Sequence, residues 1–260
     1  MIHNLTIALD RLALSERDEQ EPDAYRMSSA GKCLRYLAYV LAGYEPAPLE
    51  PRGARVFRIG DLVHADIQKS LGHAGLASRF EERVFLSVPL KEELEGRFVE
   101  LVGHIDGIYH DPEQGDKLLE IKTTTDYGFQ EVQRTQGGSI DGGYLAQNVA
   151  YQYATGLDGV WLYYNKNTSA IYSFYADKQL NRPTFIAIQD RFTKLKRFED
   201  SGDTEPPESF REHQPEQEMY RRKPTGKMKL KWQCSYCKMN GHCWPEATKE
   251  VVKGKIIYYV

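Results

Sequence analysis

Three consecutive segments of alternating apolar and polar residues restrict the fold of this chain more than any other feature. They cover residues 79–90, 97–110 and 116–125, and the polar stretch DPEQGD separates the last two. Alternation with a period of two is typical of half-buried β-strands, and clustered Pro, Gly and Asp favour a turn. The sequence therefore predicts a meander of three strands, which ends in the hairpin GHIDGIYHDPEQGDKLLEIKTTT.

Two helices are expected upstream of this meander. Ser28 or Ser29 caps the first helix, and Gly43 with Pro46 closes it, which places Cys33 in its first turns. In the second helix, within residues 50–75, helical spacing predicts an apolar stripe made of Val56, Ile59, Val63 and Ile67.

A helix, two strands and a further helix are expected downstream of the meander. They lie at residues 141–156, 159–168, 170–177 and 179–200. This order of elements predicts an α/β fold class, with a central mixed β-sheet flanked by helices. The polar residues 201–218 that follow are typical of an exposed linker.

Composition and charge restrict the class of protein. The 260 residues, 41% of them hydrophobic and 27% charged, suffice for one large globular domain with an appended lobe. No apolar run approaches the roughly 20 residues that span a bilayer, so we expect a cytoplasmic protein with no membrane partner. The formal net charge is −3, so a polyanionic partner would have to be attracted by a local basic patch.

Basic residues are concentrated in two places. Residues 221–234 hold six Lys or Arg before Trp232, and Arg52, Arg55 and Arg58 recur at a spacing of three. A solvated linker and a solvated helix face are the simpler interpretations. The candidate nucleic-acid contacts are Arg58, Lys166, Arg221, Arg222 and Lys223.

The hairpin at residues 103–125 carries polar groups that a half-buried strand does not need. Side chains alternate along a strand, so Glu120 and Lys122 share one face while Leu119 and Ile121 point into apolar surroundings. The adjacent strand can bring Asp106 beside them. Two such carboxylates would form an oxygen-rich site for Mg²⁺ or Mn²⁺, which can activate a water and neutralise a phosphodiester. Lys122 would orient or deprotonate that water, or stabilise the pentavalent phosphate. Glu82, in the strand before the hairpin, is a candidate acid outside the metal ligands, and an exposed charge on an edge strand is the simpler interpretation.

The order Asp106, thirteen residues, Glu120-x-Lys122 resembles the signature of the PD-(D/E)xK nuclease superfamily, with Ile105-Asp106 in place of its Pro-Asp. Gln147 and Tyr151 look like the Gln-x-x-x-Tyr motif of the RecB-type nucleases. The resemblance implies a restriction-endonuclease-like core. It also implies a catalytic set of Asp106, Glu120, Lys122, Gln147 and Tyr151, and a metal site of His64, Asp106, Glu120 and Ile121.

Cysteine spacing extends this resemblance. The segment CSYCKMNGHC places Cys234, Cys237 and Cys243 close together, far from Cys33. This layout resembles the iron–sulfur branch of the RecB-type nucleases, which includes the AddB nuclease domain and the iron–sulfur nucleases of CRISPR spacer adaptation. The resemblance implies that the four cysteines hold a [4Fe-4S] cluster in a lobe joining the N- and C-terminal segments. Spacing alone also fits a structural zinc site, Cys₄ or Cys₃His with His242.

Together these patterns divide the chain into an N-terminal helical segment, a nuclease core and an iron–sulfur segment, at residues 1–50, 51–200 and 201–260. The expected function is a Mg²⁺- or Mn²⁺-dependent DNA nuclease, an exonuclease or end-processing enzyme in repair or recombination. The alternatives are a structure-specific endonuclease, a non-catalytic DNA-end-binding or adaptor subunit, and a zinc-stabilised interaction module. The expected partners are single-stranded DNA or DNA ends, a second copy of the chain, or other recombination or repair proteins.

Overall fold

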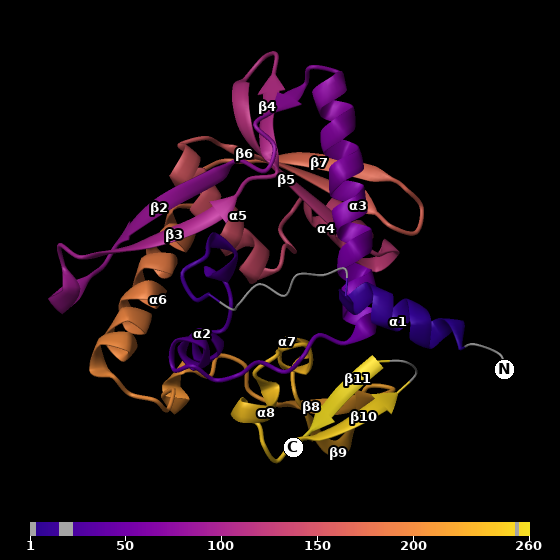
Figure 1. Ribbon diagram of the computed structural model, residues 1–260, viewed down its shortest axis with the longest axis vertical. Helices are drawn as coiled ribbons and strands as arrows, with labels where there is room; N and C mark the ends of the chain where they lie inside the picture. Colours follow the sequence, from indigo (N-terminus) through magenta and orange to yellow (C-terminus); the bar gives the residue numbers. More distant parts are fainter. Residues whose placement is uncertain (1–3, 16–22, 253–254) are drawn as a thin grey trace. The chain divides into compact units, whose positions relative to one another are not determined.

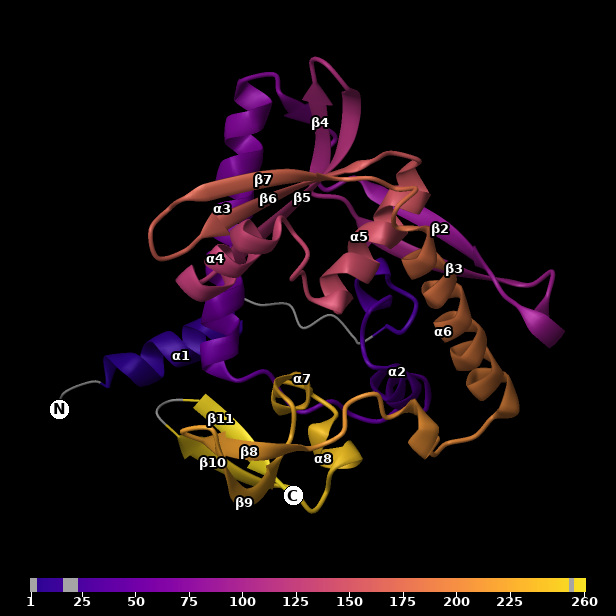
Figure 2. The same cartoon turned by 180° about the vertical axis from the view of Figure 1, so that it is seen from behind.

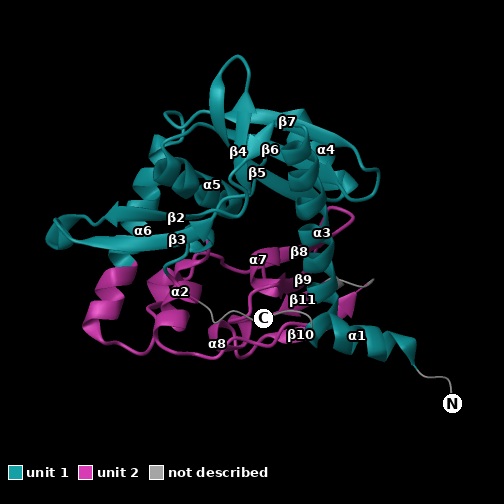
Figure 3. Cartoon of the chain, turned by 45° about the horizontal axis from the view of Figure 1, so that its top comes forward, with its two compact units in different colours: residues 1–18, 25–31, 51–194 teal, residues 19–24, 32–50, 195–260 magenta. Residues whose placement is uncertain are grey.

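The computed structural model describes residues 4–15, 23–252 and 255–260, and the chain forms two compact units (Figure 1, Figure 3). Unit 1 comprises residues 1–18, 25–31 and 51–194, and unit 2 comprises residues 19–24, 32–50 and 195–260. The chain passes between the units several times, so neither unit is one continuous segment. None of the described helices is long and apolar enough to cross a membrane.

The central sheet of unit 1 has five strands in the order β1-β4-β5-β6-β7 (Figure 2). The strands are β1 (Ala77–Ser78), β4 (Gly107–Asp111), β5 (Gly115–Thr124), β6 (Gly159–Asn165) and β7 (Ile171–Ala176). Strand β5 is parallel to β6, and every other neighbouring pair in this sheet is antiparallel. The predicted mixed sheet of an α/β protein is therefore confirmed.

Helices cover both faces of this sheet. On one face, Ile67 of α3 packs with Leu119 and Ile121 of β5. On the other face, Phe129 of α4 packs with Trp161 of β6. The helices of unit 1 that flank the sheet are α3 (Pro51–His73), α4 (Asp126–Thr135) and α5 (Gly142–Thr155). Helix α4 was not expected from the sequence.

The predicted three-strand meander is wrong at its middle strand. That segment forms two strands in different sheets, because Ile105 and Asp106 interrupt the strand. Strands β2 (Arg83–Pro89) and β3 (Phe98–His104) form a separate two-stranded sheet, whereas β4 joins the central one. Ile105 is fully buried, and its backbone bonds to the backbone of Glu81 and Glu82 instead of to a neighbouring strand.

The remaining elements of unit 1 are α1 (Leu5–Ser15), the 3₁₀ turns η1 (Met27–Ser29) and η2 (Glu92–Leu94), and α6 (Arg182–Ser201), whose last turns are counted with unit 2. The apolar stripe predicted for α3 is only half correct. Ile67 is buried and Val63 packs against the same core, but Val56 and Ile59 are 47% and 48% exposed. The apolar periodicity of α3 extends to Val56 and Ile59, but the core that contains Ile67 and Val63 does not cover that part of the helix.

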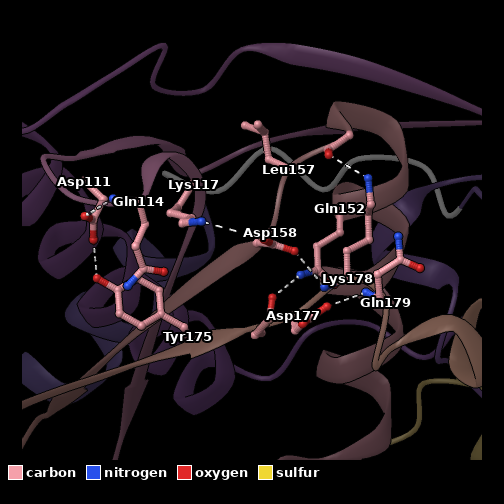
Figure 4. A network of polar contacts seen from close by, with 12 residues as sticks. Asp111, Gln114, Lys117, Gln152, Leu157, Asp158, Tyr175, Asp177, Lys178 and Gln179 are labelled. Atoms are coloured by element: carbon pink, nitrogen blue, oxygen red, sulfur yellow. Dashed lines mark hydrogen bonds and ion pairs between the residues drawn. The ribbon is translucent and has the colours of Figure 1, made fainter.

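Polar contacts fasten the outer strands of the central sheet (Figure 4). The hydroxyl of Tyr175 on β7 donates to the carboxylate of Asp111 at the end of β4, and that carboxylate also accepts the backbone amides of Glu113 and Gln114. The hydrogen bond from Tyr175 and those two amides lower the pKa of Asp111. Nearby, Lys117 lies 3.7 Å from Asp158. These contacts join β7 to β4, and β5 to the loop before β6, beyond the backbone ladders.

Unit 2 contains a small sheet and several short helices. Its strands follow the order β10-β11-β9-β8, and all pairs are antiparallel. The strands are β8 (Glu216–Tyr220), β9 (Lys223–Lys229), β10 (Thr248–Val252) and β11 (Lys255–Tyr259), and the helices are α2 (Leu34–Leu41), η3 (Glu208–Phe210), α7 (Trp232–Ser235) and α8 (Asn240–Cys243). The sequence had predicted a linker where η3 and β8 lie, so that prediction is corrected.

Helix α2 begins later than the sequence predicted. Ser28 and Ser29 belong to the separate turn η1, and Cys33 is the N-cap residue, with no side-chain capping bond. The predicted end is confirmed, because Gly43 has a φ of +76° and the amide of Tyr44 bonds back to the carbonyl of Tyr39. Glycine tolerates this left-handed conformation, which ends helices in this way.

Candidate active site

The interruption between β3 and β4, at Ile105 and Asp106, sets the position of the Asp106 side chain. The buried side chain of Ile105 anchors the chain on one side of it. On the other side, Gly107 has a φ of +155°, and a Cβ there would lie 2.7 Å from the ring of Phe80. A side chain at position 107 would therefore clash, and the bend is held at this point. Asp106 leaves the ladder and turns its carboxylate toward β5.

The carboxylate of Asp106 bonds directly to the backbone of β5. Its Oδ2 accepts a hydrogen bond of 2.7 Å from the N–H of Ile121. Strand β4 pairs with β5 only as far as Leu119, so no described strand pairs with the β5 backbone beyond that point on this side. The N–H and C=O of one residue point the same way in a strand, so the carbonyl of Ile121 also faces Asp106.

Glu120 and Lys122 form an ion pair on the face of β5 opposite Leu119 and Ile121. Their side chains are only 3% and 16% exposed. Burial raises the pKa of Glu120, and Lys122 opposes that rise. Burial alone would lower the pKa of Lys122, but the charges of Glu120 and Asp106 reverse the effect and raise it. In the free protein Lys122 is therefore a cation at neutral pH.

His64 of α3 contacts the other carboxylate oxygen of Asp106. Its Nδ1 is 3.5 Å from Oδ1 of Asp106. Burial by itself would lower the pKa of His64, but the hydrogen bond and negative charge of Asp106 outweigh burial and raise it. The two carboxylate oxygens of Asp106 therefore contact two different elements, His64 of α3 and Ile121 of β5.

Helix α5 contributes the aromatic side of the site. Gln147 lies one helical turn before Tyr151, so the two side chains share one face of α5. Burial, followed by the charges of Glu120 and Asp106, raises the pKa of Tyr151, so its phenol stays protonated at neutral pH. A Cβ at Gly103 would lie 2.6 Å from the Tyr151 hydroxyl, so only glycine admits this ring. The Lys122 ammonium lies 5.0 Å from the centre of the Tyr144 ring.

A cavity of about 450 Å³ opens beside Asp106, and part of its lining was missed by sequence reasoning. The lining residues are Asp61, His64, Ala65, Gln68, Glu81 and Asp106. Gln68 donates to Oε1 of Glu81 at 2.8 Å and to the backbone oxygen of Asp106 at 2.9 Å. Asp61 and Gln68 lie one helical turn before and after His64, so their spacing was a readable signal.

The acid upstream of the hairpin is Glu81 and not Glu82. Sequence reasoning selected Glu82 as a possible outer acid within a strand. The structure instead places Glu82 before β2, with its exposed carboxylate on Arg79. Glu81 has a left-handed φ of +53°, which redirects its side chain. Alternation along an expected strand could not reveal this change of direction.

The remaining candidate residues are distributed over both units. In unit 1, Lys166 follows the end of β6 and its amide bonds to the carbonyl of Thr124. Arg58 is exposed on α3. In unit 2, Arg221, Arg222 and Lys223 are exposed at the β8–β9 connection.

All four cysteines lie in unit 2, and none forms a disulfide. Burial, followed by the charges of Cys33, Cys234 and Cys243, raises the pKa of Cys237 to about 12. The four thiols therefore interact electrostatically. His242 is engaged elsewhere, because its Nε2 bonds to the backbone oxygen of Glu45 at 2.8 Å.

Neither the acidic site nor the thiols form a finished metal centre. Among the described residues, no three His, Cys, Asp or Glu side chains are arranged so that they could hold a metal ion. At the acidic site the ion pair of Lys122 with Glu120 and the contact of His64 with Asp106 use the oxygens that a cation would need. A bound cation would have to displace these contacts.

Comparison with known proteins establishes the fold alone. No family model and no curated protein matches the chain. The crystal structure of SSO0001 is similar, with 16% sequence identity and a TM-score of 0.53, over 94% of this chain and 98% of the other. The crystal structure of LHK-Exo in complex with dAMP also matches, with 14% identity and a TM-score of 0.40, over 74% of this chain and 89% of the other. The chain shares its fold with SSO0001.

Proposed function

We propose that the protein is a divalent-metal-dependent DNA nuclease that acts at DNA ends. The observation that carries this proposal is the hydrogen bond from the Ile121 amide to Asp106, because it holds one carboxylate beside the strand that bears Glu120 and Lys122. Two carboxylates, a cationic lysine and a histidine beside a polar cavity form a donor set suited to a hard cation and a phosphodiester.

The donor chemistry fits Mg²⁺ or Mn²⁺. Asp106 and Glu120 would hold the cation, with His64 and the carbonyl of Ile121 as further ligands. When bound, the cation would lower the pKa of a water and neutralise charge on the phosphate. The raised pKa of Lys122 favours a cationic role for it, contacting phosphate oxygen, over that of a base. The protonated Tyr151 can donate a hydrogen bond at the same site.

We further propose that Cys33, Cys234, Cys237 and Cys243 hold a [4Fe-4S] cluster that stabilises unit 2. Four free thiols whose charges interact, with His242 engaged by Glu45, form a donor set that fits an iron–sulfur cluster better than a Cys₃His zinc site. Arg211 and Arg35 oppose the burial-driven rise in the pKa of Cys243 and so favour its thiolate, which is the ligand form. The cluster would be structural and take no part in cleavage.

Incubation of anaerobically purified protein with linear and closed-circular DNA tests the nuclease proposal. Both DNAs carry an internal label, the linear one is also end-labelled, and each is incubated with Mg²⁺, Mn²⁺ or EDTA. We expect the end label to be released from the linear DNA only when metal is present, while the circular DNA stays intact. Cutting of the circle would instead assign an endonuclease. DNA binding without any cleavage would support the non-catalytic end-binding alternative and contradict a nuclease.

A further inference from the structure

The hairpin formed by β8 and β9 has an unusual turn. Tyr220 pairs with Lys223, so Arg221 and Arg222 alone connect the strands. Both arginines have positive φ, 48° and 65°. Two-residue hairpin turns with positive φ at both positions favour Asn-Gly, because other side chains are strained there. Sequence reasoning therefore could not predict this turn, and the arginines are present despite a conformational cost.

The positive charge at this turn is not neutralised within the hairpin. Farther along β9, Lys227 lies 3.4 Å from Glu250 and Lys229 lies 3.3 Å from Glu216. By contrast, no ion pair joins Arg221, Arg222 or Lys223 to a described acidic side chain. Glu218, the acid nearest in sequence, accepts hydrogen bonds from Tyr259 at 2.6 Å and from Thr225 at 2.8 Å. Three exposed cationic side chains therefore converge on one turn.

An aromatic ring accompanies these charges. Tyr220 is 64% exposed, and the guanidinium of Arg221 lies 5.3 Å from the centre of its ring. A tyrosine ring and a guanidinium plane both stack on nucleobases, and cationic side chains neutralise phosphates. In a duplex the faces of the bases are covered by their neighbours, whereas an unpaired strand presents them.

We propose that the β8–β9 tip, defined as Tyr220, Arg221, Arg222 and Lys223, binds single-stranded nucleic acid. Phosphates contact the cationic side chains, and an unpaired base stacks on Tyr220. This inference rests on the proposed DNA nuclease function. It adds that unit 2 binds the unpaired form of the substrate. It concerns binding only and requires no particular placement of the two units.

Equilibrium binding of a labelled oligodeoxythymidine and of a blunt-ended DNA duplex formed from two separate strands, both in EDTA, tests the proposal without any cleavage. Replacing Tyr220 by Ala should weaken oligodeoxythymidine binding about tenfold, the effect of losing one base–aromatic stack, and leave duplex binding unchanged. Tyr220→Phe should retain the affinity. The double variant R221Q/R222Q should reduce the salt slope by about 1.4, or roughly 0.7 for each lost phosphate contact.

The paired lysines of the same hairpin provide a matched control. K227Q/K229Q removes the same formal charge from the same two-stranded element, but these ammonium groups are neutralised by Glu250 and Glu216. Its affinity for the oligonucleotide should stay within about twofold of the wild type. An equal loss in both double variants would show a general charge effect and overturn the assignment to the tip.

Exchange of the turn for Asn-Gly separates binding from folding. R221N/R222G relieves the strained backbone and removes both charges. We expect the melting temperature to rise while affinity for the single strand falls. Unchanged affinity in this variant or in Tyr220→Ala would contradict the proposal. Since binding is measured without metal, this outcome is distinct from failure of the nuclease proposal, which cleavage assays with Mg²⁺ decide.

Discussion

The Oδ2 atom of Asp106 accepts the backbone N–H of Ile121 at 2.7 Å. This bond joins the segment between β3 and β4 to β5, the strand that carries Glu120 and Lys122. The pairing of Gly107 with Leu119 places Asp106 opposite Glu120, and the bond to Ile121 then fixes the Asp106 carboxylate against β5. It also gives Asp106 a structural contact in addition to its proposed role as a metal ligand.

The first prediction concerns the glycine that admits Tyr151. Gly103→Ala should lower the free energy of unfolding by about 1–3 kcal/mol, because its Cβ would clash with the Tyr151 hydroxyl. Gly60→Ala is the matched control, since a Cβ on this helical residue meets only Thr123 Oγ1 at 3.8 Å. That variant should stabilise the protein by about 0.5–1 kcal/mol. Denaturant titration of both variants measures the difference, and equal effects would contradict this packing.

A second prediction concerns the cavity acid. Glu81→Gln should reduce metal-dependent cleavage about 10- to 100-fold, as expected for a group that supports a metal site from outside. Gln68→Leu should have a similar effect, because Gln68 holds Glu81 by a 2.8 Å hydrogen bond. Single-turnover cleavage rates measure both. Full activity in both variants would remove Glu81 from the proposed site.

The third prediction is a pH dependence of stability. The hydrogen bond from Tyr175 and the amides of Gln114 and Glu113 hold the pKa of Asp111 below its ordinary value. Its stabilisation is therefore complete above the ordinary aspartate pKa of about 4. It is lost as pH falls through the lower folded-state value. Tyr175 has a pKa of about 12 and stays protonated throughout this range.

Melting temperatures of the wild type and Asp111→Asn between pH 7 and pH 2 test this sign. The wild type should melt at a higher temperature than Asp111→Asn at neutral pH. The difference between the two melting temperatures should become smaller below about pH 4. Tyr175→Phe removes the same hydrogen bond and should show the same narrowing. A gap that stays constant down to pH 2 would show that the Asp111 contact makes no pH-linked contribution.

A fourth prediction concerns the thiols. Anaerobically purified protein should be brown and contain about four irons per chain. Cys33→Ser should lower the iron content and the melting temperature, because a link from residue 33 to residue 243 closes a long loop worth roughly 5 kcal/mol in the loop-entropy model. Ser235→Ala, between Cys234 and Cys237, should change neither. Colourless protein with one zinc per chain would contradict the cluster.

Alternation predicted the two faces of β5 better than it predicted the bounds of the strands around it. Alternation placed Glu120 and Lys122 on one face of β5 and Leu119 and Ile121 on the other, as the structure has them. The break at Asp106 was missed because apolar and polar residues keep alternating through it. Its cause is the backbone bonding of Ile105, which only the folded chain reveals.

Two other parts of the chain lacked a local signal. Strands β8, β9 and β10 of unit 2 are rich in Lys, Glu and Thr and bury few side chains, so their sequence resembles a solvated linker. Their two-residue turn has Arg221 and Arg222 where glycine or asparagine would have indicated a hairpin. Glu81 was passed over because its left-handed backbone, which turns it toward the cavity, cannot be read from alternation.

Rates of linear-DNA cleavage with Mn²⁺ or Mg²⁺, measured for Glu120→Gln and for Glu82→Gln, test the proposed metal site most directly. Both substitutions remove one carboxylate, but Glu120 is buried beside Lys122 and Glu82 is exposed on Arg79. We expect a loss of at least about 100-fold for Glu120→Gln, the effect of several kcal/mol at a metal site, and a wild-type rate for Glu82→Gln. Equal metal-dependent rates for Glu120→Gln and the wild type would contradict the proposed metal site.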